Sequence, residues 1–188
     1  MDWLIAQVKP NGRYGFSHLT LTIPNETSLS EMVKSIRASF RKLRQTKFWK
    51  KRVIGGVFVI EITGEEGNWH AHIHAIIEAR YMLYDKLVEL WKRCSGGIGV
   101  WIARIKKKGI TSYITKYLTK AGTPEAQLYH MSSALKGARL ISPFGSWYAI
   151  SALYVKPVGR CKDCKATDFS IASILLYGQF KGTYSRYD

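Results

Sequence analysis

The chain has 188 residues, a formal net charge of +16 from 29 lysines and arginines against 13 aspartates and glutamates, and a hydrophobic content of 46%. This composition excludes a disordered chain, and the length allows one domain whose core needs no disulfide bonds. No run approaches the roughly 20 apolar residues of a membrane-spanning helix, and no G-x-x-x-x-G-K-[ST] motif of a P-loop motor occurs.

A strand followed by a helix is predicted near the N-terminus. The alternating, β-branched sequence of residues 18–23 predicts the strand, and Ser28 or Ser30 can cap a helix that continues to about Trp49. Apolar side chains recur along this helix at helical spacing and predict its buried face: Leu29, Val33, Ile36, Phe40 and Leu43.

The next elements are a hairpin, a helix, a strand and a further helix. Residues 53–63 and 69–78 predict two strands joined by turn residues. A helix over 83–94, a strand over 98–105 and a helix over 109–121 follow. The first of these helices has an apolar set that we expect to point inward: Leu83, Leu87, Leu90 and Trp91.

This order of elements, β-α-β-β-α-β and then a helix, predicts an α+β fold of the ferredoxin or RRM type. Such a fold has an antiparallel sheet with its helices on one face, which leaves the other face open for function. We expect residues 1–122 to form this core and residues 123–188 to form a C-terminal extension packed on it, of unassigned role. Within the extension, a helix over 125–137 and a strand over 147–155 are expected.

A basic stripe lies beside the apolar face of the first predicted helix. Between residues 34 and 52 the sequence has nine lysines and arginines and no acidic residue. A membrane surface could attract this helix, but other elements are also basic, which favours a nucleic acid as the partner. Four stripe residues are therefore candidates for contacts with DNA phosphates: Lys34, Arg37, Arg41 and Arg44.

Three histidines alternate with apolar residues in the segment Trp69-His70-Ala71-His72-Ile73-His74. Side chains two apart on a strand point to the same face, so the three imidazoles are aligned. His70 and His74 lie about 13 Å apart along the strand, so His72 has to be one member of any pair that shares an ion. A single histidine on a basic strand could be incidental, whereas three at this spacing indicate a site.

A carboxylate from across the hairpin can complete this site. If Glu66 and Gly67 form a two-residue turn, Glu61 opposes His72 on the same face. A different turn would bring Glu65 or Glu66 there instead. Two imidazoles and a carboxylate suit a divalent ion with open positions, so the sequence predicts a catalytic metal centre.

The predicted helix over 109–121 presents two tyrosines and two lysines on one face. Tyr113, Lys116, Tyr117 and Lys120 recur at positions i, i+3, i+4 and i+7. A neighbouring ammonium group favours the phenolate form of a tyrosine and can neutralise a phosphate. Taken alone, the same pattern would also suit half-buried aromatic rings with snorkelling lysines.

Together, the histidine strand and the tyrosine helix resemble the HUH endonucleases, and among them the rolling-circle replication initiators of plasmids and small viruses. The metal motif matches at His72-Ile73-His74 and the tyrosine motif at Tyr117-Leu118-Thr119-Lys120. The segment Leu19-Thr20-Leu21-Thr22 resembles the opening motif of that family, and Tyr113 makes the helix similar to that of the two-tyrosine initiators. The likeness covers residues 16–122 and nothing of the tail.

The resemblance implies a metal-dependent DNA endonuclease and strand transferase with a 5′-phosphotyrosine intermediate. Mg²⁺ or Mn²⁺ would be held by His72, His74 and Glu61, with His70 as a neighbour or an alternative ligand. Tyr117 would be the nucleophile, flanked by Lys116 and Lys120, and Tyr113 would serve a second transfer or pack. The implied partners are the single-stranded DNA of a replication origin and the helicase and polymerase of a host, with no membrane.

Three cysteines are a sparse, odd number, which predicts a reducing compartment, and the N-terminus lacks a secretory signal; we expect the host cytoplasm. Cys161 and Cys164 in a C-x-x-C segment could form half of a zinc site. The remaining ligands would have to be Cys94 or His130, which no characteristic spacing supports, so a plain turn is the preferred interpretation.

Three other functions stay open from the sequence. A transposase for single-stranded DNA uses the same parts and differs in its products. A non-catalytic RRM-like module would display aromatic side chains on the open sheet face, where this sequence places histidines and a glutamate. A structural metal-binding protein would leave the tyrosine and lysine helix unexplained.

Overall fold

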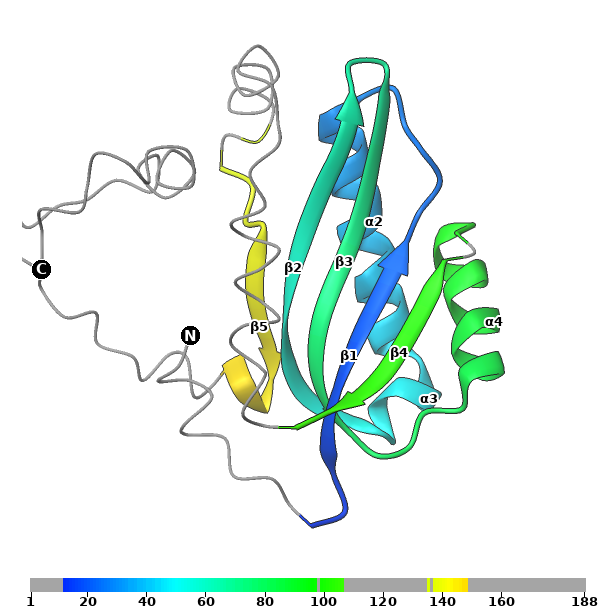
Figure 1. Ribbon diagram of the computed structural model, residues 1–188, viewed down its shortest axis with the longest axis vertical. Coiled ribbons are helices and arrows are strands. Elements are labelled where there is room, and N and C mark those ends of the chain that lie inside the picture. Colours follow the sequence, from blue (N-terminus) through cyan, green and yellow to red (C-terminus); the bar gives the residue numbers. More distant parts are fainter. Residues whose placement is uncertain (1–11, 98, 107–134, 136, 149–188) are drawn as a thin grey trace, which may run out of the picture.

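The computed structural model describes residues 12–97, 99–106, 135 and 137–148 (Figure 1). Within these ranges the chain forms a five-stranded sheet in the order β4-β1-β3-β2-β5, in which every neighbouring pair is antiparallel. In chain order the elements are β1 (Gly15–Thr22), α2 (Leu29–Gln45), α3 (Lys47–Lys50), β2 (Val53–Glu65), β3 (Asn68–Ala79), α4 (Tyr84–Ser95), β4 (Val100–Ile105) and β5 (Ile141–Gly145).

The three helices cover one face of this sheet, and the opposite face carries none of them (Figure 1). The order β4-β1-β3-β2 with two helical crossovers is that of a ferredoxin-like fold, so the predicted α+β class is confirmed. None of the helices within the described ranges is both long and apolar enough to cross a membrane.

The first predicted helix divides in two at Thr46. Ser28 caps α2, since its side chain accepts a hydrogen bond from the Glu31 amide, as the sequence suggested. Thr46 has an extended backbone, its hydroxyl donates to the carbonyl of Leu43, and the same oxygen accepts from the amide of Trp49. The residue therefore ends α2 and begins α3, where the sequence had predicted one continuous helix.

The main core lies between the helices and the sheet. All five apolar residues predicted for the buried face of α2 are buried, and Phe40 contacts the rings of Trp49, Phe58 and Phe144. On α4, three of the four side chains expected to point inward are buried: Leu87, Leu90 and Trp91. Leu83 is 51% exposed, because it occupies the N-cap position before the first turn of α4.

The strand expected over 147–155 is corrected by β5, which lies earlier and pairs with β2 from Gly55 to Val59. Gly145 has a positive φ of 60°, which turns the chain out of β5, and residues 146–148 form a helical turn instead. Trp147 in this turn is fully buried, and its indole nitrogen donates to a carboxylate oxygen of Glu78 at 3.0 Å. β5 and Trp147 thereby attach this part of the chain to the sheet.

Other predicted features of the second half fall outside the described residues. They are the helix over 109–121, the boundary at residue 122 and residues 149–155. Of the helix expected over 125–137, the structure describes Leu135 and Gly137, which lie in turns.

Gly56 marks the tightest backbone approach in the sheet. A Cβ added there would stand 2.2 Å from the carbonyl oxygen of Ile76, whereas one added at Gly12 would meet nothing within 4 Å. We expect Gly56→Ala to lower the free energy of unfolding by about 1–3 kcal/mol, because β2 and β3 must separate locally. Thermal denaturation followed by circular dichroism measures this effect. Equal melting temperatures for Gly56→Ala and the control Gly12→Ala would contradict the described strand spacing.

Candidate metal centre on the sheet face opposite the helices

The register of the β2–β3 hairpin confirms the pairing predicted from its turn. Glu66 and Gly67 lie at the turn, Gly67 has a φ of 84°, and Glu61 stands directly opposite His72. Glu65 opposes Asn68 at the tip of the hairpin, so it lies away from His72 and His74. The two-residue turn therefore selects Glu61 among the candidate carboxylates.

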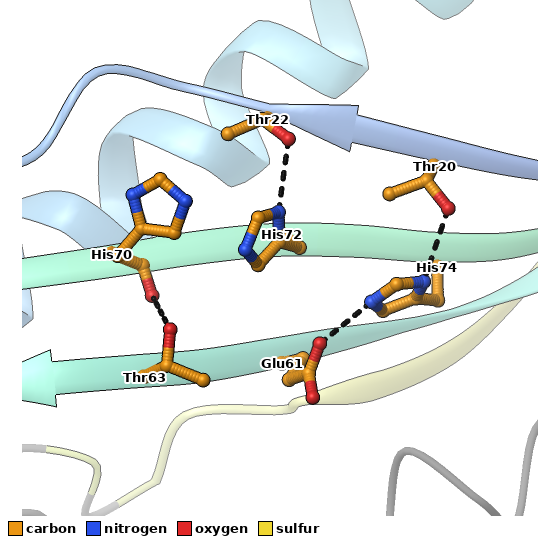
Figure 2. A network of polar contacts seen from close by, with 7 residues as sticks. All are labelled: Thr20, Thr22, Glu61, Thr63, His70, His72 and His74. Atoms are coloured by element: carbon orange, nitrogen blue, oxygen red, sulfur yellow. Dashed lines mark hydrogen bonds and ion pairs between the residues drawn. The ribbon is translucent and has the colours of Figure 1, made fainter. Parts of the chain in front are cut away.

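Two threonines of β1 face two of the histidines. Thr22 is the strand partner of His72 and Thr20 that of His74. Their hydroxyl oxygens form hydrogen bonds with the Nδ1 atoms of these rings, at 2.9 Å for Thr22 and His72 and 3.2 Å for Thr20 and His74 (Figure 2). The rings are thus oriented from β1, with Nδ1 turned towards that strand.

The carboxylate of Glu61 reaches His74, the diagonal neighbour across the strand pair. Glu61 Oε2 and His74 Nε2 lie 2.8 Å apart, and both residues are 8% exposed (Figure 2). In an antiparallel pair such a diagonal neighbour lies within reach of a long side chain. The site therefore holds Glu61 and both imidazoles together, with Glu61 on the side of β2 and the threonines on the side of β1.

These contacts define the proton positions that His74 can take. The Glu61 carboxylate only accepts, so Nε2 carries the hydrogen in this contact, and a neutral His74 then accepts at Nδ1 from the Thr20 hydroxyl. A hydroxyl can also accept, so Thr20 can receive a hydrogen bond from Nδ1 when Nε2 binds a metal. Thr20 consequently supports His74 in both arrangements.

His70 is held differently from the other two histidines. Its ring lies 4.4 Å from the ring of His72, but its Nδ1 forms a hydrogen bond with the side chain of Asn25. Asn25 also donates to Asn68, so His70 is tied to the loop after β1 and to the hairpin tip. Its position beside the pair suits the neighbouring role expected for it.

The donor set fits a divalent ion by its chemistry. His72, His74 and Glu61 offer two imidazoles and a carboxylate, and hydroxyl groups behind both rings are typical outer partners of metal-bound histidines. In the described ranges, no three histidine, cysteine, aspartate or glutamate side chains are already arranged as ligands. Ligation at His74 Nε2 requires Glu61 to give up its hydrogen bond with that atom.

Sequence reasoning missed the roles of β1 and β4 in this site. His18 is 3% exposed and stacks on His74 at 5.7 Å, and Trp101 contacts the His18 ring edge-on at 5.1 Å. The period of two along β1 already places His18, Thr20 and Thr22 on one face. The position of Trp101, opposite Thr20, follows only from the pairing of β1 with β4.

The remaining predicted site residues lie elsewhere or outside the described ranges. Lys34, Arg37, Arg41 and Arg44 lie on α2, which packs on the sheet face opposite the histidines (Figure 1). Cys94 is half-buried on α4, and burial raises the pKa of its thiol, which lowers its reactivity. Seven named residues are outside the described part: Tyr113, Lys116, Tyr117, Lys120, His130, Cys161 and Cys164.

Comparison with known proteins identifies the family of the chain. A family described as "Replication protein" matches residues 3–152. This chain belongs to that replication protein family. The match confirms the resemblance to replication initiators, and it extends beyond residues 16–122 to include residues 123–152 of the tail.

One relative of the chain is a protein named "Protein rep" from a Bacillus species. It is 33% identical over 90 residues, which are 42% of this chain and 29% of the relative. The chain thus matches less than a third of that relative's length. No solved structure matches the chain.

The threonine hydroxyls should matter for metal affinity. We expect Thr22→Val to weaken Mn²⁺ binding about 10- to 100-fold, because the His72 ring loses the partner that orients it. Thr22→Ser keeps a hydroxyl and should bind like the wild type. Isothermal titration with Mn²⁺ measures both variants, and circular dichroism checks their folding. Unchanged affinity in a folded Thr22→Val protein would remove Thr22 from the site.

Proposed function

We propose that this chain nicks and rejoins single-stranded DNA at a replication origin and so initiates rolling-circle replication. One observation carries the proposal: His72 and His74 lie with Glu61 on the sheet face opposite the helices, in a member of the replication protein family. A replication protein acts on DNA, and the charge of +16 suits that polyanion.

The site residues prepare a phosphodiester for attack. Mg²⁺ or Mn²⁺, held by His72, His74 and Glu61, would polarise the scissile phosphate and stabilise the negative charge that develops on it. Thr20 and Thr22 keep the two imidazoles in place from β1. His18 packs against the His74 ring and limits its rotation.

Tyr117 is the proposed nucleophile. Its oxygen forms a bond with phosphorus while the bond from phosphorus to the 3′ oxygen breaks, and the phenolic proton ends on the released 3′-OH. Lys116 and Lys120 flank it in sequence and favour the phenolate. The products are a 5′-phosphotyrosine and a 3′-OH that a host polymerase can extend, while a host helicase unwinds the duplex. Attack by a second 3′-OH reverses the step and rejoins DNA without ATP.

Trp101, on the same face of the sheet, offers an aromatic surface for an unpaired base. Trp101 is 49% exposed on β4, in the same cross-strand row as Thr20 and His74. Stacking on such a side chain is worth about 1–3 kcal/mol per base. Trp101 favours single-stranded DNA as the substrate.

The same tryptophan is the observation that favours a second candidate, a non-catalytic RRM-like nucleic-acid-binding module. A covalent protein–DNA adduct separates the two candidates, because a binding module forms none. A single-strand transposase would form the adduct as well, but it would release an excised circle after two cleavages.

Metal dependence is the first test of this function. His72→Ala should abolish cleavage of single-stranded origin DNA in Mn²⁺ while leaving the fold and most DNA binding intact, because His72 is a ligand in the proposed site. EDTA should do the same to the wild type. His70→Ala should have a smaller effect, since His70 contacts Asn25. A denaturing gel reads out cleavage, and full activity in EDTA would exclude the mechanism.

The two tyrosines can be separated by phenylalanine substitutions, which remove only the hydroxyl. Tyr117→Phe should form no covalent adduct with single-stranded origin DNA. Tyr113→Phe should still cleave, and should fail at termination only if the two tyrosines alternate. Peptide mapping of the trapped adduct identifies the residue independently. An adduct on Tyr113 in the wild type would reverse the assignment.

A further inference from the structure

A second, strongly basic site lies on the other face of the sheet. A pocket of about 710 Å³ opens between α2 and residues 137–139. Val33 and Phe58 supply apolar wall, and none of the described residues that line it is an aspartate or glutamate. Five of these described residues are cationic, four from the predicted stripe and one from the segment before β5: Lys34, Arg37, Arg41, Arg44 and Arg139.

The positive charge in this pocket has little compensation from carboxylates. Lys34 forms an ion pair with Glu31, and no other lining cation has a carboxylate within ion-pair distance among the described residues. Arg37 donates instead to the backbone carbonyl of Arg139, which links α2 to the segment before β5. The pocket therefore has cations on two sides and suits an anionic ligand.

Arg44 lies at the inner end of this array. Its guanidinium stacks on the rings of Phe40 and Phe144, each with its centroid 5.1 Å away, and its Nε is buried without a hydrogen-bond partner. Burial, and next the charges of Arg37 and Arg41, lower the pKa of Arg44. The three arginines repel one another, and an anion bound between them would offset that repulsion and stabilise the charged form of Arg44.

We propose that this pocket binds backbone phosphates of a DNA segment other than the one that is cleaved. From Lys34 to Arg44 the stripe runs about 15 Å along the helix, a length that matches about four phosphates of one DNA strand. The stripe and the histidines lie on opposite faces of one sheet (Figure 1). The nucleotides bound at the metal centre therefore cannot also lie along α2. This inference rests on the proposed function for its partner, DNA, and assigns that partner a second contact.

Direct binding tests the pocket without any cleavage step. The probe is a fluorescent duplex of about 30 base pairs and arbitrary sequence, titrated at several salt concentrations by fluorescence anisotropy. All proteins carry His72→Ala, so the metal centre plays no part. One variant adds Arg37→Gln, Arg41→Gln and Arg139→Gln. A matched control adds Lys42→Gln, Lys47→Gln and Lys50→Gln, which removes the same charge from exposed positions that do not line the pocket.

We expect the pocket variant to lose at least tenfold in affinity for the duplex. The slope of log K against log salt concentration should become less steep by about 2 to 3, or about 0.9 per lost contact. The control should lose much less. Arg41→Glu, a single change at an exposed position, should reproduce part of the loss even if the triple variant folds poorly.

Equal losses in the pocket variant and the control would overturn the proposal, because net charge alone would then explain binding. Micromolar binding of ATP or pyrophosphate that the pocket variant loses, with unchanged affinity of that variant for the duplex, would also overturn it and assign the pocket to a small anion. Failure of the nicking proposal appears elsewhere, as the absence of a covalent adduct, and leaves this binding result unaffected.

Discussion

The pairing register of one hairpin is the constraint on which the candidate site depends. Side chains along a strand alternate with a period of two, so a shift of one residue in β2 against β3 would move Glu61 to the opposite face from His72. The turn at Glu66 and Gly67 prevents that shift, since two residues close the hairpin and Gly67 accepts the positive φ that the turn requires. The position of Glu61 beside the histidines thus depends on the turn between β2 and β3.

The central position of β3 explains why two neighbouring strands can act on the same histidines. β3 lies between β1 and β2, so the rings of His72 and His74 each have a threonine of β1 on one side and β2, which carries Glu61, on the other. On the opposite face, the same strands contribute to the apolar core under α2. One layer of backbone therefore separates the histidine row, and the small apolar cluster around Trp147 on the same face, from the main core and the basic helix beyond it.

Local patterns predicted most of the described fold, and long-range packing accounts for what they missed. The apolar spacing of α2 and the alternation of β3 are local, so the buried face and the histidine row could be read from the sequence. The division of the helix at Thr46 depends on one hydroxyl that makes two backbone contacts. β5 could not be predicted in this way, because its pairing with β2 joins residues more than 80 positions apart.

The same distinction holds for the site. His72, His74 and Glu61 follow from strand period and turn length, which are local properties. Thr20 and Trp101 meet them only through the pairings of β1 with β3 and β4, which the sequence pattern does not specify. The roles of Tyr113 and Tyr117 stay predictions from the sequence.

Because the strands differ in length, the three histidines are held by different numbers of paired strands. β1 pairs with β3 only as far as Thr22 and His72, while β2 and β3 continue together to the hairpin tip. His74 is therefore flanked by paired strands on both sides, and His72 lies at the last pair of β1 with β3. His70 lies beyond it, where the isolated bridge from Glu26 to Trp69 and the Asn25 side chain hold the hairpin. The number of paired strands beside each histidine thus decreases from two at His74 and His72 to one at His70.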